Sequence, residues 1–74
     1  MSRLPTVTPK QMVRVLKRAG FVKSHQKGSH LYLFNPTLQR ITSVAIHAKD
    51  LKRAVMKEIL RQAGLSETEF RKLL

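Results

Sequence analysis

The chain has 74 residues, no cysteine, and 15 lysines and arginines against four aspartates and glutamates. This length fits a single domain over residues 1–74 with a thin core, because a chain of this size buries only about 60% of its unfolded surface. The lack of cysteine argues against a secreted, disulfide-stapled protein and favours a reducing cytoplasm. No apolar stretch is long enough to span a membrane, and the N-terminus shows no signal peptide.

The charge balance indicates the class of partner. A formal net charge of +11 favours polyanions, which are nucleic acid, an acidic protein or an anionic membrane, with nucleic acid the commonest. The few acidic residues do not readily build a two-metal site or a glycosidase carboxylate pair. Three histidines without cysteine also make a weak zinc set. An enzyme with this composition is expected to work without a metal or other cofactor.

The first predicted element is a helix over residues 8–20, "TPKQMVRVLKRAG". Thr8 is its candidate N-cap, Pro9 suits the first helical position, and Gln11 completes a capping-box pattern. Gly20 supplies a C-terminal stop. The helix has an apolar stripe of Met12, Val13, Leu16 and Ala19 and a basic face of Lys10, Arg14, Lys17 and Arg18.

Three short strands follow, at residues 21–26, 29–34 and 41–47, because these segments are rich in β-branched and aromatic residues. Lys27-Gly28 is the expected turn of the first hairpin, and Asn35-Pro36 ends the second strand. A two-residue turn at that place would pair His25 with His30.

A second long helix is predicted from about Asp50 to Ala63, with Gly64 at its end. Its expected apolar seam consists of Leu51, Val55, Ile59 and Ala63. "SETE" at residues 66–69 predicts a capping box for a short terminal helix. The predicted fold class is α+β, ordered α-β-β-β-α, with a three-stranded antiparallel sheet packed on two helices and a short C-terminal helix.

Two helices can cover only one face of such a sheet, which leaves the other exposed to water. Side chains alternate along a strand, so the two faces have different members. The expected covered set is Leu31, Leu33, Val44 and Ile46. The expected open-face set is Lys23, His25, His30, Tyr32 and His47.

Histidines that converge on a basic, open sheet suggest RNA cleavage. This reaction proceeds by general acid–base chemistry on the 2′-hydroxyl and the leaving oxygen, and histidine titrates near neutrality. Lys27 is placed to stabilise charge on the scissile phosphate, and Gly28 lets the turn approach a phosphate backbone without a side chain in the way. The alternative is that these are structural or merely exposed residues of an ordinary hairpin.

The sequence resembles a known family in "GFVKSHQKGSHLYL" and in "VAIHAKDLKRAVMKEILRQAGLSETEF", from about Thr8 to Phe70. These motifs are similar to those of HicA-type toxins of bacterial and archaeal toxin–antitoxin systems. The resemblance implies a fold like the double-stranded RNA-binding domain and ribosome-independent mRNA interferase activity. It implies that His30, in the glycine-serine-histidine motif, is catalytic. It also implies an mRNA substrate and a HicB-type antitoxin that covers the active surface, with oligomerisation through the toxin–antitoxin complex.

The sequence departs from the family pattern in three places. Ala45 stands where the family usually has proline, and His25 where it commonly has arginine. Ala54-Val55-Met56 replaces a glycine-threonine-leucine, which predicts an earlier helix start near Asp50 because alanine is a better helix former than glycine. None of these touches Gly28-Ser29-His30.

Several questions stay open at this level. The second proton-transfer group is His25, His47 or Tyr32, and each also has a structural alternative. The residues expected to contact RNA are Lys23, His25, Lys27, Gly28, Ser29, Tyr32 and His47. A non-catalytic RNA-binding module explains the same charge and fold, and so does an interaction protein whose basic surface binds an acidic antitoxin.

Overall fold

The computed structural model describes residues 4–74 and confirms the predicted α-β-β-β-α order. The elements are α1 (Pro9–Arg18), β1 (Val22–Lys27), β2 (His30–Asn35), β3 (Arg40–Ala45), α2 (Arg53–Ala63) and α3 (Glu67–Leu73). The first three residues of the expected single domain lie outside the described part of the chain.

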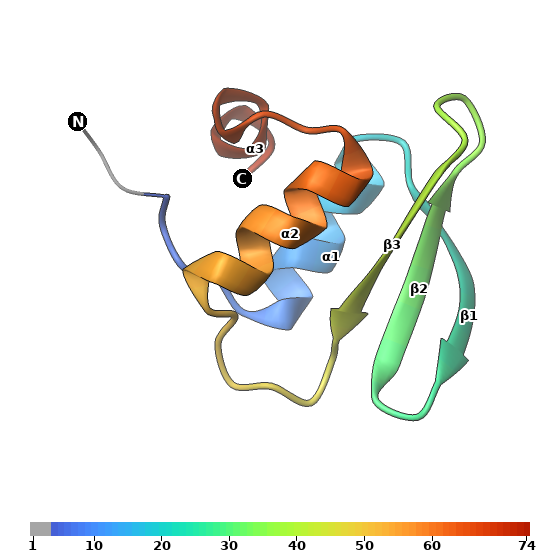
Figure 1. Cartoon of the computed structure of the whole chain (residues 1–74), viewed down its shortest axis with the longest axis horizontal. Helices are drawn as coiled ribbons and strands as arrows, with labels where there is room; N and C mark the ends of the chain where they lie inside the picture. The colour runs from blue at the N-terminus through green and yellow to red at the C-terminus, as the bar shows by residue number, and fades with distance from the viewer. Residues whose placement is uncertain (1–3) are drawn as a thin grey trace.

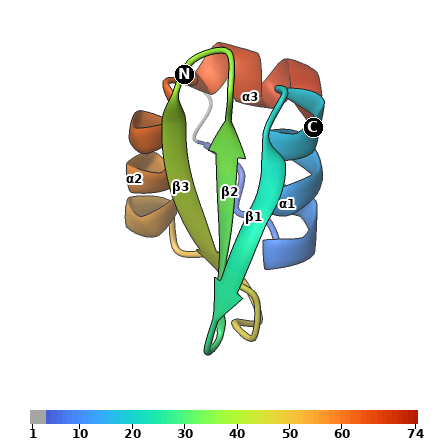
Figure 2. The ribbon, with the colours of Figure 1, turned by 90° about the vertical axis from the view of Figure 1, so that its right-hand side faces the viewer.

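The strands form one antiparallel sheet in the order β1-β2-β3. Helices α1 and α2 both lie against one face of this sheet, α2 on the β3 side and α1 on the β1 side, as the view onto the strands shows (Figure 2). The short helix α3 lies across one end of the two long helices, on the side away from the β2–β3 connection (Figure 1). No helix of residues 4–74 lies over the opposite face of the sheet, which is called the open face below (Figure 2).

The core lies between the sheet and the two long helices. Leu31, Leu33 and Val44 are buried as predicted, and Ile46 is half-buried against them. Phe70 of α3 is fully buried and closes one end of the core. The other buried apolar side chains are Leu4, Val7, Met12, Val15, Leu16, Phe21, Leu51, Met56, Ile59, Leu60 and Ala63.

Both predicted capping boxes are present. The Gln11 backbone N–H donates to the Thr8 hydroxyl at 3.2 Å, and the Thr8 backbone N–H donates to the Gln11 side chain at 2.9 Å. Ser66 and Glu69 make the same reciprocal pair at the start of α3. These bonds satisfy N–H groups that have no partner inside a helix, so both helices begin where the sequence indicates.

The prediction that α2 starts near Asp50 is wrong. The helix begins at Arg53, and the residues before it run as turns and extended chain. The Leu51 backbone N–H donates to the Val7 carbonyl at 2.9 Å, and the Leu51 side chain is buried. This contact with the N-terminal segment holds Leu51 outside the helix, so tertiary packing overrides the helix propensity of the local sequence.

The apolar seam of α2 also differs from the prediction. Ile59 and Ala63 are buried as expected, but Val55 is 45% exposed. Met56, one position further along, is fully buried in its place. Because neighbouring residues on a helix point about 100° apart, the buried stripe is rotated and Val55 stays at the surface.

The predicted register of the first hairpin is wrong by two residues. The turn consists of Gly28 and Ser29, and Lys27 lies opposite His30. His25 therefore faces Tyr32 instead of His30. A slip of two residues preserves the face on which each side chain lies, so His25 remains on the same face as His30.

Lys23 is not on the open face, which corrects another prediction. The β1–β2 register shifts between Lys23 and His25, so Ser24 forms a bulge. Lys23 is then paired with Leu33, whose side chain faces the helices. Directly opposite residues of an antiparallel pair share a face, and Lys23 accordingly borders a hollow beside α1.

Candidate functional site on the open face of the sheet

The hairpin turn brings Lys27 and His30 together at one end of the open face. Gly28 has a φ of +61°, which glycine adopts without strain, and Ser29 completes a two-residue turn. The Ser29 carbonyl accepts a hydrogen bond from the Ile46 backbone N–H at 2.9 Å. The turn is thus tied to the chain that leaves β3, and the exposed His30 and Lys27 lie beside it.

The middle of the open face holds a pair of stacked rings. His25 and Tyr32 lie opposite each other, with ring centroids 4.6 Å apart and planes 6° from parallel. Ser24 Oγ lies 3.1 Å from His25 Nδ1. On the side of Tyr32 away from His25, the directly opposite residue on β3 is Ser43, which has a small side chain.

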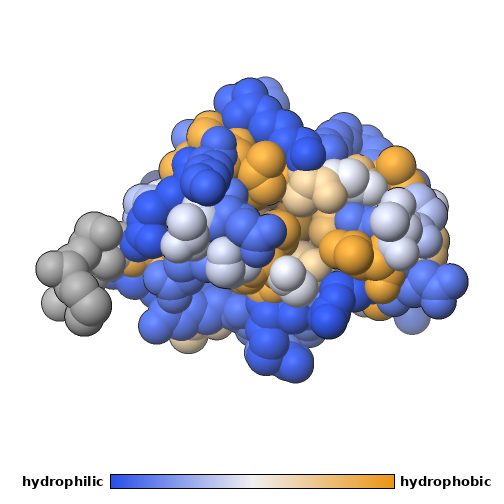
Figure 3. Space-filling view, turned by 90° about the horizontal axis from the view of Figure 1, so that it is seen from above, coloured by the Kyte–Doolittle hydropathy of each residue, from blue (hydrophilic) through white to orange (hydrophobic). Residues whose placement is uncertain are grey.

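The far end of the open face is apolar. Val22 and Ile41 lie opposite Phe34 on the two outer strands. Val22 is 53% exposed and Ile41 is 51% exposed. Viewed from the end that carries α3, hydrophobic residues emerge between hydrophilic ones (Figure 3). The open face therefore changes from cationic and histidine-bearing at the hairpin turn, through aromatic, to apolar.

His30 also borders a groove between the sheet and α2. The groove has a volume of about 340 Å³. Its sheet side is formed by His30, Ser43 and Ala45, and its helix side by Ala54, Val55, Glu58, Ile59 and Gln62. Sequence reasoning missed the helix side of this groove, because the predicted apolar seam of α2 placed Val55 in the core.

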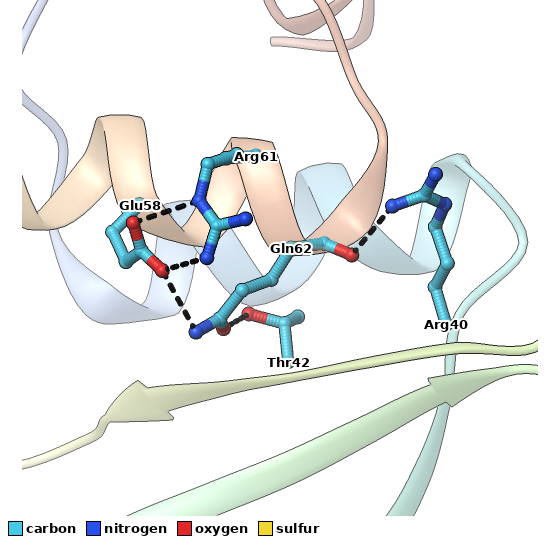
Figure 4. Close-up of polar contacts among 5 residues, drawn as sticks. All are labelled: Arg40, Thr42, Glu58, Arg61 and Gln62. Carbon is cyan, nitrogen blue, oxygen red and sulfur yellow. Dashed lines mark hydrogen bonds and ion pairs between the residues drawn. The ribbon is translucent and has the colours of Figure 1, made fainter.

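A polar network fixes the helix side of this groove (Figure 4). Glu58 pairs with Arg61 and accepts a hydrogen bond from Gln62 Nε2 at 3.2 Å. Thr42 Oγ1 donates to Gln62 Oε1 at 2.9 Å, which links β3 to α2. The hydrogen bond from Arg61 lowers the pKa of Glu58, so this carboxylate stays ionised at neutral pH.

A second basic region lies on the other side of the sheet, beside α1. The predicted basic face of α1 is exposed along its length, at Lys10, Arg14, Lys17 and Arg18. Lys10, Lys17 and Lys23 also line a hollow of about 430 Å³ between α1 and β1. Lys23 therefore belongs with the basic face of α1 and not with His30.

His47 lies beyond the strand whose alternation predicted it to be on the open face. Strand β3 ends at Ala45, and His47 follows in an exposed turn. Strand alternation therefore does not assign it to the open face. Within residues 4–74, no group of three histidine, aspartate or glutamate side chains lies close enough to hold a metal ion. Metal-independent chemistry stays a prediction.

A helix, a three-stranded antiparallel sheet and two further helices define a small basic α+β protein, and its uncovered sheet face carries histidine and lysine. The chain belongs to the HicA toxin family, because the sequence model described as the HicA toxin of bacterial toxin–antitoxin matches residues 9–65 of the 74. The resemblance noted in the sequence is thereby confirmed. A comparison with curated proteins gave no match.

The family assignment makes this chain a toxin of a toxin–antitoxin system and implies an antitoxin partner. The matched residues include α1, the whole sheet and α2, and therefore every open-face residue described above. Within residues 4–74, no helix has the length and apolar character needed to cross a bilayer.

Proposed function

We propose that this toxin is a metal-independent RNA endonuclease, an mRNA interferase, in which His30 transfers a proton during cleavage. The observation that supports it most is the placement of His30. Its imidazole is exposed on the open face, directly opposite Lys27 and next to a glycine turn. An exposed imidazole, a cation and an unobstructed backbone are the groups that acid–base cleavage of RNA needs.

The proposed step is a transesterification. A base takes the proton from the 2′-hydroxyl, whose oxygen then forms a bond to phosphorus. The bond from phosphorus to the 5′-oxygen breaks, and an acid donates a proton to that leaving oxygen. His30 serves as one of these two groups, and Lys27 stabilises the negative charge that develops on the phosphate.

The second proton-transfer group is drawn from the same face. His25 is the first candidate because it lies diagonally across the ladder from His30. Tyr32, stacked on His25, is the second candidate. His47 lies in an exposed turn beyond the end of β3 and is not assigned to the open face, so it is left out of the proposed step.

The antitoxin partner is proposed to be of the HicB type and to bind over the open face. A protein that covers His30 and Lys27 would exclude RNA, and an acidic partner would match a toxin with a net charge of +11. Oligomerisation would then occur through the toxin–antitoxin complex. Exposed apolar side chains at the far end, such as Val22 and Ile41, would add buried area to this contact.

The test is to incubate the purified toxin with a long single-stranded RNA in excess EDTA, beside the His30→Ala variant. His30 is exposed, so its replacement should not unfold the protein. Fragments from the wild type alone would establish a metal-independent nuclease that depends on His30. Intact RNA in both reactions, with RNA still bound, would contradict the proposal.

A non-catalytic RNA-binding module is the second candidate function. The observation that favours it is the basic face of α1, which is exposed and independent of His30. Such a module would bind RNA equally well before and after His30→Ala and would release no fragments. Steep salt dependence is expected of both functions, because phosphate contacts release counterions, so salt titration does not distinguish them.

A further inference from the structure

We propose that a nucleobase of single-stranded RNA stacks on the β3-facing side of the Tyr32 ring, one nucleotide away from the phosphate beside His30. This inference rests on the proposed function, because it places the base next to the bond that the toxin would cut. With such a subsite, the open face would recognise a nucleobase in addition to binding phosphate.

The two sides of the Tyr32 ring have different surroundings. On the β1 side, His25 stacks on Tyr32 with ring centroids 4.6 Å apart and planes 6° from parallel. On the β3 side, the directly opposite residue is Ser43, whose side chain is too small to cover a phenol ring. One aromatic side of Tyr32 is therefore occupied and the other borders open space.

The open space on the β3 side is a hollow of about 270 Å³. It is lined by Tyr32, Ile41, Thr42, Ser43 and Gln62. Ile41 is 51% exposed and offers an apolar wall near the aromatic one. A flat ligand with apolar faces fits between such walls, and proteins bind the bases of single-stranded RNA by stacking them on aromatic side chains.

The remaining walls offer hydrogen bonds to the edge of a base. Gln62 is fixed in position, because its Oε1 accepts from Thr42 and its Nε2 donates to Glu58. An amide nitrogen has two donors, so one N–H of Gln62 is left for a ligand. The Ser43 hydroxyl also lines the hollow, and a hydroxyl can both donate and accept a hydrogen bond. A base has polar edges and apolar faces, and the hollow offers partners for both.

The hollow adjoins the groove beside His30. Ser43 and Gln62 line both spaces, so the two spaces are direct neighbours. His30 and Tyr32 are two positions apart on β2, which places them on one face about 7 Å apart. One extended nucleotide spans such a distance. A phosphate beside His30 therefore brings a neighbouring base over Tyr32.

The first experiment uses the native protein, because Tyr32 is the only tyrosine and there is no tryptophan. Intrinsic fluorescence then reports on this residue alone. The probe is a short 2′-O-methyl RNA, which cannot be cleaved through its 2′-oxygen. An abasic oligonucleotide of equal charge is the matched control. We expect saturable quenching by the base-bearing probe, after correction for its absorption, and little quenching by the abasic one.

The possible outcomes separate this inference from the proposed function. Equal quenching by both probes, or binding without quenching, would overturn the base subsite and assign the hollow to another occupant, such as an antitoxin side chain. Cleavage of RNA would be unaffected by that result. Failure of the toxin to bind either probe would overturn the base subsite, and the cleavage assay with long single-stranded RNA decides separately whether the toxin is a nuclease.

A second experiment fills the hollow. Ser43→Leu places a larger side chain where the base would stack. Thr68→Leu places the same side chain at an exposed position of α3, far from the hollow in the sequence, and serves as the control. We expect Ser43→Leu to lower affinity for the base-bearing probe about tenfold and to leave affinity for the abasic probe unchanged. It should also weaken the nucleotide preference beside the cleavage site. Unchanged affinity and preference in a variant with the native melting temperature would overturn the inference.

Discussion

Lys27 and His30 lie directly opposite each other where the β1–β2 ladder meets its turn. Both side chains project from the open face, because opposite residues of an antiparallel pair share a face. Lys23, on the same strand, projects from the other face because the bulge at Ser24 intervenes. Strand β1 therefore has two lysines of equal charge on opposite sides of the sheet.

This pair of lysines separates phosphate stabilisation at the cleavage site from general attraction to RNA. Lys27→Ala should lower the single-turnover cleavage rate by about tenfold. This loss is smaller than the 10²–10³ typical of a rigid oxyanion donor, since an exposed lysine is flexible. Lys23→Ala removes the same charge and should weaken RNA binding while leaving the rate at saturating protein unchanged. Equal losses of rate in the two variants would contradict the assignment of Lys27.

The turn residue Gly28 is expected to matter through its backbone alone. A Cβ built at Gly28 would meet nothing within 4 Å, but its φ is +61°. Gly28→Ala should therefore lower the free energy of unfolding by about 1 kcal/mol, the usual cost of a left-handed residue with a side chain. Urea denaturation measures this change.

Gly64→Ala provides the comparison for Gly28→Ala. Gly64 has a φ of +73°, and a Cβ there would lie 2.7 Å from Arg40 Nε. This variant should lose more stability, because the Arg40 side chain must also move away from the Gln62 carbonyl that it contacts. A Gly28→Ala variant less stable than Gly64→Ala would show that the hairpin turn has contacts beyond its backbone conformation.

The capping box of α3 should make stability depend on pH. Hydrogen bonds from the Ser66 backbone and side chain lower the pKa of Glu69 below its usual 4.5. A carboxyl with a lowered folded-state pKa contributes stability above its unfolded pKa, and this stability is lost as the pH falls through the folded value. Glu69→Gln keeps an acceptor for the cap but does not titrate.

The measurement is the free energy of unfolding at neutral pH and at a pH below 4.5. The wild type should lose more stability than Glu69→Gln on acidification. Glu58, whose pKa is also lowered, is present in both proteins and cancels in the comparison. Identical pH dependence in the two proteins would mean that the Glu69 bond contributes nothing in solution.

Most of the fold was predictable because short local motifs mark where α1 and α3 begin. Thr8 with Gln11 and Ser66 with Glu69 form the capping boxes that the sequence indicates. The start of α2 was not predictable from local propensity, because Leu51 is held by a backbone bond to Val7, far away in the sequence. Such a contact leaves no periodic pattern in the sequence.

The places of His25, His30 and Lys27 in the candidate site were predictable, and those of His47 and Lys23 were not. His25, His30 and Tyr32 share the open face even though the assumed register was wrong, because a slip of two residues preserves the face. Lys23 was misplaced because the bulge at Ser24 has no glycine or other marker. The wall formed by α2 was missed altogether, since its position follows from how the helix packs against β3.

The most direct test of the central claim compares cleavage rate with RNA affinity for the wild type, His30→Ala and His47→Ala. His47 is an exposed histidine beyond the end of β3, so its variant controls for loss of an imidazole. We predict that His30→Ala cleaves about 10²–10⁴-fold more slowly at saturating protein, with unchanged affinity, and that His47→Ala cleaves nearly as fast as the wild type. Cleavage by His30→Ala at the wild-type rate would contradict the claim that His30 transfers a proton to or from RNA.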